Sequence, residues 1–402
     1  MAKVPLITAL RPNTLLATAD RYIPVAGTSD GTETTEANIE FKVKESATLS
    51  DLWAYVDVVS SANISLQLRK NNSDGNLNVS LNSVGAVEDT SNTDSVVNND
   101  DISYQYDRAA GQAGPSMIRV MYESASGDLV VPCVSNSPGG LGIGTTNRYP
   151  AVMGEVTGIV SESPLNQREI SYNATWHNLA FYTPSNSKSI GVPVKSRING
   201  ADGNQNLTVP SSTSGYFEDT SNTDDLAPGD LINYVVEIGG VGIITFSTIA
   251  SLITYDTTTG MSMWSDSRAN STRTGSATTH FFPLIGGNNG WASNTDEAAA
   301  QVKAGLSGTL KNFTAYTGSV NYTANVTARI RINGADGNQS ITVVAGDPSS
   351  QYVDTSNTDD IVPTDLVCVS VTGGTSGKCN HRGWGIDFEY ATGTTRRIFV
   401  VS

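Results

Sequence analysis

Three aspartate-rich hexapeptides are the part of this sequence whose residue types could do chemistry. The stretch Asp-Thr-Ser-Asn-Thr-Asp stands at 89–94, 219–224 and 354–359, and another Asp follows six residues after each copy. Carboxylate and amide oxygens are the ligands that Ca²⁺ prefers. The candidate calcium ligands are therefore Asp89, Asp94, Asp100, Asp219, Asp224, Asp230, Asp354, Asp359 and Asp365.

A turn is the competing interpretation, and the sequence favours it. The order of residues is not that of an EF-hand loop, which needs ligands at alternate positions and a Gly at the sixth. Asp, Ser, Thr and Asn side chains readily bond nearby backbone N–H groups, so such a run makes a self-satisfied connection. We expect the hexapeptides to reverse the chain between strands, with no cofactor bound and calcium as the open alternative.

Catalytic groups do not recur with the repeat. Asp225 and Asp360 extend two of the hexapeptides, but Ser95 replaces them in the first. His177, His280 and His381 share no aligned position. A reaction centre common to the copies would lose its acid–base pair in one of them, so we predict that the chain is not an enzyme and has no catalytic residues.

The hexapeptide belongs to a longer repeat of about 130 residues. An Arg stands five residues before an Asp-Gly-Asn triplet upstream of each copy, and farther upstream "LSDLWAY", "WHNLAFY" and "LKNFTAY" align. Each copy is long enough to bury its own core. The predicted division is an N-terminal arm at 1–21 and three β-sandwich repeats at 22–148, 149–280 and 281–402.

The pattern inside each repeat predicts short antiparallel strands. Runs such as "VKSRI" and "NLTVP" are β-branched, and an Asp-Gly pair between them is a favoured hairpin turn. Leu49, Leu52 and their counterparts are expected in the core, with Tyr55 outward. Only "DEAAAQVKAGL", from Asp296, has helical composition. The predicted fold is all-β, with three tandem homologous jelly-roll-like β-sandwich domains after a short N-terminal arm.

Composition limits the classes of partner. A net charge of −15 disfavours nucleic acid and anionic membranes. Cys133, Cys368 and Cys379 are expected to be buried thiols, with a Cys368–Cys379 disulfide as the alternative. Arg11 and Pro12 interrupt the first apolar run, so we expect synthesis in a cytosol without the usual export.

The combination "RxNGADGN…TVP…DTSNTD…GDL" resembles jelly-roll structural proteins of tailed bacteriophage virions, of the capsid-decoration or tail-appendage type. The first copy departs from it at "KNNSDGN" and "NNDD". The resemblance implies a non-enzymatic capsid decoration protein, made in the host cytoplasm and located in the virion. Its implied partners are the major capsid protein or tail proteins, with self-association as a trimer. The residues 2–20 would then be an anchor on neighbouring subunits.

A tail fibre or baseplate protein that binds host surface glycans is the alternative that this resemblance leaves open. A cellular carbohydrate-binding or adhesion protein fits less well, because the sequence lacks the expected export signal.

Overall fold

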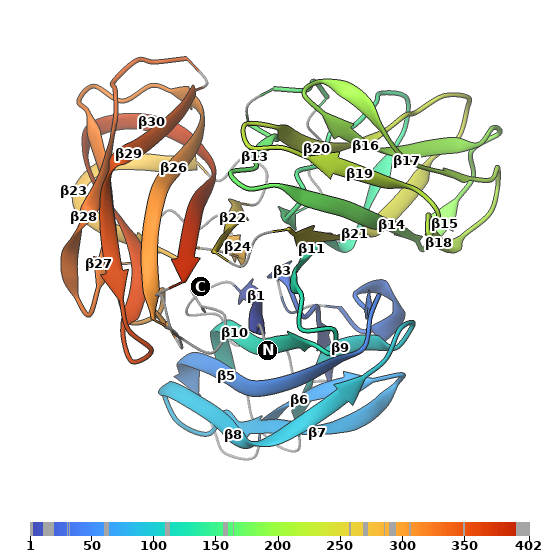
Figure 1. Cartoon of the computed structure of the whole chain (residues 1–402), viewed down its shortest axis with the longest axis horizontal. Helices are drawn as coiled ribbons and strands as arrows, with labels where there is room; N and C mark the ends of the chain where they lie inside the picture. Colours follow the sequence, from blue (N-terminus) through green and yellow to red (C-terminus); the bar gives the residue numbers. More distant parts are fainter. Residues whose placement is uncertain are drawn as a thin grey trace.

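The computed structural model describes most of the 402 residues. The described residues are 3–10, 20–29, 31, 33–59, 64–108, 113–155, 160–163, 165–256, 259–267, 272–284, 286–288, 295–304, 307–348 and 350–390. They form strands in several mostly antiparallel sheets, so the predicted all-β class is confirmed. Figure 1 shows three groups of strands around a common centre, which we call units 1, 2 and 3 in chain order.

Unit 1 comprises strands β1 to β10 and pairs two sheets face to face. One sheet has the order β3-β1-β10-β5-β8, built from Gly27–Ser29, Lys3–Leu10, Ala113–Ser124, Ala47–Val59 and Gly85–Val96. The other has the order β2-β9-β6-β7, with β4 also beside β9, built from Arg21–Ile23, Asp101–Arg108, Ile64–Lys70, Ser73–Ser80 and Phe41–Lys42. A short 3-10 helix, η1, spans Glu36–Asn38.

Unit 2 repeats this plan with strands β11 to β21. The first sheet contains β11, β12, β14, β15, β18, β19 and β21, at Leu129–Ile143, Gly154–Glu155, Ala174–Thr183, Ser185–Asn186, Gly215–Glu218, Thr223–Leu226 and Ile244–Tyr255. The second has the order β13-β20-β16-β17, at Arg168–Glu169, Leu231–Val236, Val192–Ile198 and Ala201–Val209.

Unit 3 repeats the plan again with strands β22 to β30, but one long strand runs through both sheets. The first part of β30 (Leu366–Tyr390) pairs with β27 and the second part with β26. The remaining strands lie at Gly260–Ser267 (β22), Thr272–Phe282 (β23), Gly286–Asn288 (β24), Val302–Lys303 (β25), Gly308–Val320 (β26), Val326–Ile332 (β27), Ala335–Val343 (β28) and Ser350–Ile361 (β29).

The alternation of side chains follows the prediction. In β6, β16 and β27 every second residue is buried, because successive side chains of a strand point to opposite faces. Leu49 and Leu52 are fully buried and Tyr55 is half-buried, as expected. Tyr316, the counterpart of Tyr55 in the third repeat, is buried instead, because Arg168 of unit 2 lies over its ring.

Two predictions about the segments around the repeats are wrong. Lys3–Leu10 is no irregular arm: it forms β1, pairs antiparallel with β10, and buries Leu6, Ile7 and Leu10. The segment from Asp296 forms a turn in which the Ala300 and Gln301 N–H groups bond to the Glu297 carbonyl. The described part of the segment, 296–304, forms no helix, because pairing of β25 with β30 overrides the local alanine preference.

The first strands of units 2 and 3 begin earlier in the chain than the predicted boundaries of the repeats. β11 pairs with β21, and β22 pairs with β30, although the repeat pattern assigns these two strands to the preceding copies. The strand arrangement therefore favours boundaries between β10 and β11 and between β21 and β22. These connections lie near residues 125–128 and 256–259.

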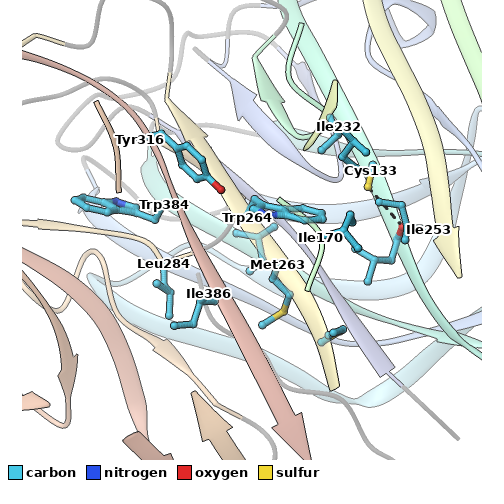
Figure 2. Packing of buried hydrophobic residues seen from close by; sticks show 14 of the residues in the cluster. Cys133, Ile170, Ile232, Ile253, Met263, Trp264, Leu284, Tyr316, Trp384 and Ile386 are labelled. Atoms are coloured by element: carbon cyan, nitrogen blue, oxygen red, sulfur yellow. Dashed lines mark hydrogen bonds between the residues drawn. The ribbon is translucent and has the colours of Figure 1, made fainter. Parts of the chain in front are cut away.

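The core is less divided than we expected from three separate repeats. One apolar cluster belongs almost wholly to unit 1, but a second one is continuous through units 2 and 3 and also includes Ile7 and Trp53 of unit 1. Figure 2 shows Trp264 of β22 between Ile170 of unit 2 and Trp384 of unit 3. Burial of apolar surface therefore stabilises the contacts between units as well as the interior of each one.

Candidate functional site

The hexapeptides of units 1 and 3 lie within single strands, and that of unit 2 joins β18 to β19, which pair in succession with the same strand, β14, so none of the three reverses the chain. In unit 1 the hexapeptide strand pairs with β5 both before and after a bulge, with Leu52 opposite Asp89 and Ser50 opposite Thr93. Three residues therefore bulge out opposite Asp51, whose φ of 54° is in the left-handed region. Asn178 in unit 2 and Asn312 in unit 3, at the positions equivalent to Asp51, also have positive φ values, of 57° and 54°. The prediction of a chain reversal is wrong.

The first Asp of each hexapeptide stabilises this bulge. Asp89 Oδ1 accepts the N–H groups of Ser91 and Asn92 at 3.1 Å each, which is an Asx turn. Asp89 Oδ2 accepts the N–H of Asn78, on edge strand β7 of the opposite sheet, at 3.1 Å. Asp219 and Asp354 make the same three bonds in units 2 and 3.

The last Asp of each hexapeptide also bonds the neighbouring edge strand. Asp94 accepts the N–H groups of Asn76 at 2.8 Å and Leu77 at 2.9 Å. In unit 3, Asp359 accepts those of Asn338 and Gln339 at 2.6 and 3.1 Å. We call the two hexapeptide carboxylates and the edge-strand N–H groups that they accept the carboxylate clasp.

The clasp explains the glycine that precedes these N–H groups. A Cβ on Gly75, Gly203 or Gly337 would lie 2.7–2.8 Å from an oxygen of Asp94, Asp224 or Asp359. Glycine is needed here for close approach, and the hairpin itself turns three residues before the Asp-Gly pair. The turn residues are Asn199-Gly200 in unit 2, with φ of 51° and 78°. The hairpin prediction is confirmed, but its turn is not at Asp-Gly.

The first copy, which lacks the Asn-Gly pair, turns in the same way. Asn71 and Asn72 have φ of 50° and 61°. The Asn71 amide also donates to Asp100 at 2.6 Å, and its carbonyl oxygen accepts the N–H of Asp101 at 2.8 Å. Asp230 and Asp365 make matching bonds with Asn199 and Asn333. Asp100, Asp230 and Asp365, the third candidate calcium ligand of each copy, are therefore each hydrogen-bonded to the turn of the hairpin.

These bonds affect the acidity of the first Asp. Burial alone would raise the pKa of Asp89, but the hydrogen bonds from Asn92, Asn78 and Ser91 outweigh it and lower the pKa. The pKa values of Asp219 and Asp354 are lowered for the same reason. Within the described part of the chain, no three His, Cys, Asp or Glu side chains lie close enough together to hold a metal ion.

Sequence reasoning missed an ion-pair cluster beside the turn of each hairpin. Arg197 reaches Glu162 at 2.7 Å and also contacts Asp202. Arg69 binds Glu36 and Asp74, and Arg331 binds Glu297 and Asp336, in the same arrangement. The Arg was visible as a repeated residue. The Glu was not, because it lies 33, 35 or 34 residues upstream in segments without a shared motif.

The residues considered for catalysis are dispersed. Asp225 and Asp360 are exposed, and Asp360 accepts a bond from Thr309. His177 lies between Asn178 and Thr254, at 2.6 and 2.8 Å, and His280 is buried. The side chain of His381 lies outside the described residues.

The described thiols are structural in character. Cys133 and Cys368 are buried and free, and burial raises the pKa of both, which suppresses the reactive thiolate. The alternative of a disulfide between Cys368 and Cys379 is therefore wrong, although the side chain of Cys379 lies outside the described residues.

The units meet at three interfaces, which we call seams. At each seam, a residue in or next to one equivalent short strand of a unit contacts the following unit. Lys44, just after β4, contacts Tyr216 of unit 2, and Arg168 of β13 lies 4.3 Å from the ring centroid of Tyr316 in unit 3. The Lys303 carbonyl in β25 accepts a bond from Arg119 of unit 1 at 3.5 Å. Because β4, β13 and β25 are matching strands, the contacts run from unit 1 to 2, from 2 to 3 and from 3 to 1, and the ring closes (Figure 1).

The seam between units 2 and 3 holds a buried carboxylate. Asp387 accepts the hydroxyl proton of Ser262 at 2.7 Å and a bond from the Asn312 amide at 2.7 Å. Burial raises its pKa, and these hydrogen bonds oppose the shift. The Ser262 hydroxyl in turn accepts the N–H of Ser171, so a continuous hydrogen-bonded path crosses the seam.

Comparison with known proteins defines no family. No protein-family model matches the chain, and no curated protein matches it. Among the described residues, no helix has the length and apolar content needed to span a bilayer.

Solved structures show only distant likeness. A chain from a structure on the triple jelly roll fold and turret assembly in an archaeal virus shares 12% identity with this one, with a TM-score of 0.18 over 87% of this chain and 81% of that one. A chain of infectious bursal disease virus, Gx strain, shares 6% identity, with a TM-score of 0.18 over 97% and 81%. PNGF-II shares 9% identity, with a TM-score of 0.20 over 88% and 99%. Scores this low carry no argument about function.

Proposed function

We propose that this chain is a non-enzymatic structural component of a virus particle, and specifically a decoration protein on the capsid of a tailed bacteriophage. The three units would be sandwich domains that together form one pseudo-trimer. The observation that carries the proposal is the closed ring, in which three similar units meet through matching strands.

A ring of this kind suits a shell built from repeated subunits. Icosahedral shells offer many three-fold and quasi-three-fold positions. A pseudo-trimer presents three similar surfaces around one axis, so a single chain can contact three neighbouring capsid subunits. Such multivalent contact strengthens attachment without requiring a tight individual contact.

The clasp supports a role in a crowded assembly. Strands β7, β17 and β28 are edge strands, and an open edge invites pairing with another chain. The hexapeptide carboxylates occupy edge N–H groups in all three units. A net charge of −15 adds mutual repulsion between copies. Both features let many copies lie close together without edge-to-edge association.

The dispersed titratable groups support a non-enzymatic role. The buried groups with raised pKa values serve seams or cores: Asp387 bonds Ser262 and Asn312, and Cys133 is fully buried. Perturbed groups of an active site would instead be expected to converge in one cleft.

One observation favours the alternative, a tail fibre or baseplate protein that binds host glycans. The Thr, Ser, Asn and Thr of each hexapeptide are exposed in all three units. Exposed hydroxyl and amide groups are suitable donors and acceptors for sugar hydroxyls. Their threefold repetition would give a glycan-binding protein avidity.

Imaging of intact particles by cryo-electron microscopy separates the two functions. The decoration role predicts the ring at three-fold or quasi-three-fold positions over the whole shell, with purified chain rebinding to stripped capsids. A location confined to the tail, with binding on a glycan array, would overturn it in favour of receptor binding. Absence of the chain from particles would overturn both.

A further inference from the structure

We propose that the exposed hydroxyl groups of the three hexapeptides are three equivalent contact sites, each of which binds one copy of the same protein subunit around a three-fold position. This inference rests on the proposed function, in which those subunits are the capsid protein, and it identifies the surface that contacts them. We call the hydroxyl-bearing residues the hydroxyl patches: Thr90, Ser91 and Thr93 in unit 1, Thr220, Ser221 and Thr223 in unit 2, and Thr355, Ser356 and Thr358 in unit 3.

The patches are exposed in every unit. A strand on the surface of a sandwich buries every second side chain, but the residues from Thr90 to Thr93 are exposed at four successive positions. The bulge therefore leaves side chains of both strand faces accessible. The same run of exposed positions recurs at 220–223 and 355–358.

The fold of a unit does not require the patch hydroxyls. Asp89 and Asn92 hold the bulge through their side chains, with the Asn92 amide nitrogen 3.0 Å from Asp89 Oδ2. Ser91 contributes its backbone N–H to the same Asp, and not its hydroxyl. Among the described residues, no group is hydrogen-bonded to a patch hydroxyl.

The other exposed residues that the copies share between the hairpin turn and the hexapeptide do have partners in their own unit. These pairs are Asn71 with Asp100, Asp74 with Arg69, and Asn76 with the Thr93 carbonyl. Units 2 and 3 repeat all of these contacts. The patches are thus the shared exposed groups whose identity the fold does not explain.

Duplication of the repeat does not by itself explain this identity, because positions on both sides of the hexapeptide have diverged. The flanking residues are Glu88, Glu218 and Val353 directly before the hexapeptide, and Ser95, Asp225 and Asp360 directly after it. An external partner that contacts the hydroxyls gives a reason for keeping them the same in all three copies.

Three identical patches indicate three identical partner surfaces. At the seams, where the chain meets surfaces that differ, the contacting residues differ as well. Because the units close into a ring of matching strands, the patches are related by its pseudo-three-fold axis (Figure 1). They therefore match three copies of one subunit around a three-fold position. A net charge of −15 disfavours further copies of this chain as the partner.

A protein surface fits a patch better than a sugar does. Small-ligand sites are concave and bury most of the ligand, whereas the four successive hexapeptide residues are all open to solvent. Each hydroxyl donates one hydrogen bond and accepts others, so the complementary surface carries backbone or side-chain amide groups. The bonds to Asp89 fix the bulge before binding, which lowers the entropic cost of the contact.

Rebinding of the full chain to stripped capsids tests the patches one unit at a time. One variant carries Thr90→Ala, Ser91→Ala and Thr93→Ala, and two others carry the matching changes in unit 2 or unit 3. We expect each to bind at least about tenfold more weakly than the wild type, by a similar factor in all three, with further loss when patches are combined. The control is Ser80→Ala with Ser83→Ala, which removes exposed hydroxyls of unit 1 outside its patch and is expected to leave binding unchanged.

Thermal unfolding of the same variants separates an external contact from a role in the fold. We expect midpoints within about 2 °C of the wild type. A midpoint lowered as far as that of Asp89→Ala, or patch variants that bind capsids as the wild type or the control does, would overturn the inference and leave the capsid role standing. A wild-type chain that does not rebind stripped capsids would overturn the proposed function and the inference together. Binding on a glycan array that the patch variants lose would replace the protein partner with a sugar.

Discussion

The clasps of the three units are nearly identical to one another, whereas the seams between the units differ from one another. The three clasps use the same residue types with nearly the same bonds, whereas each seam uses a different set of groups: Lys44 with Tyr216, Arg168 with Tyr316, and Arg119 with the Lys303 carbonyl. A clasp contacts only its own unit, so the same local geometry must be met three times. A seam must fit two surfaces that differ from one unit to the next. The hydrogen bonds of each clasp within its own unit give the repeated hexapeptide a role in the folding of that unit.

The largest effect is expected from a residue between units. Trp264→Ala removes a side chain that is 1% exposed and packs between units 2 and 3, so we expect a loss of about 3–5 kcal/mol in the free energy of unfolding. Chemical denaturation measures it. A cost near that of Val362→Ala, at a position that is 50% exposed, would show that the continuous core does not join the units.

A residue inside one unit gives the matched comparison. Leu179 is fully buried in unit 2, and Leu179→Ala is expected to cost about 2–5 kcal/mol through lost packing and a cavity. Hydrogen exchange is expected to rise first in unit 2. If unit 1 lost protection equally, the separate core of that unit would be disproved.

Gly203→Ala tests the close approach at a clasp. The added Cβ would lie 2.3 Å from the Ser196 hydroxyl oxygen and 2.7 Å from Asp224 Oδ1, so we expect a loss of about 1–3 kcal/mol in thermal or chemical unfolding. Gly144→Ala, where an added Cβ meets nothing within 4 Å, is the control and is expected to be near neutral. Equal effects of the two substitutions would contradict the proposed geometry.

The smallest effect is expected from acid. Because the pKa of Asp354 is lowered from 3.8 in the folded chain, its contribution to stability is complete above that value and is lost as the pH falls below it. Asp354→Asn should therefore flatten the fall of stability below about pH 4. Asp225→Asn, at an exposed position, should leave the fall unchanged. The opposite ranking of the two variants would exclude a clasp role for Asp354.

The sequence predicted the repeated features of the fold better than the features that join the repeats. The all-β class, the hairpins and the buried positions Leu49 and Leu52 follow from local patterns and were confirmed. The strand at Lys3–Leu10 was missed because its pairing with β10 depends on contacts more than a hundred residues apart.

The candidate site was predicted in part. The repeated Asp residues were singled out from the sequence, but the partners of their hydrogen bonds could not be, because backbone N–H groups carry no residue signature. Glu162, the partner of Arg197, was missed because its spacing from the Arg differs between copies. The seams were not visible at all, since their residues share no motif.

An experimental structure of the chain grown with millimolar calcium tests the central claim most directly. The account predicts three clasps with no ion, in which Asp94, Asp224 and Asp359 accept edge-strand N–H groups while the three units close into one ring. A calcium ion bound by any of these carboxylates in place of the N–H groups would contradict it.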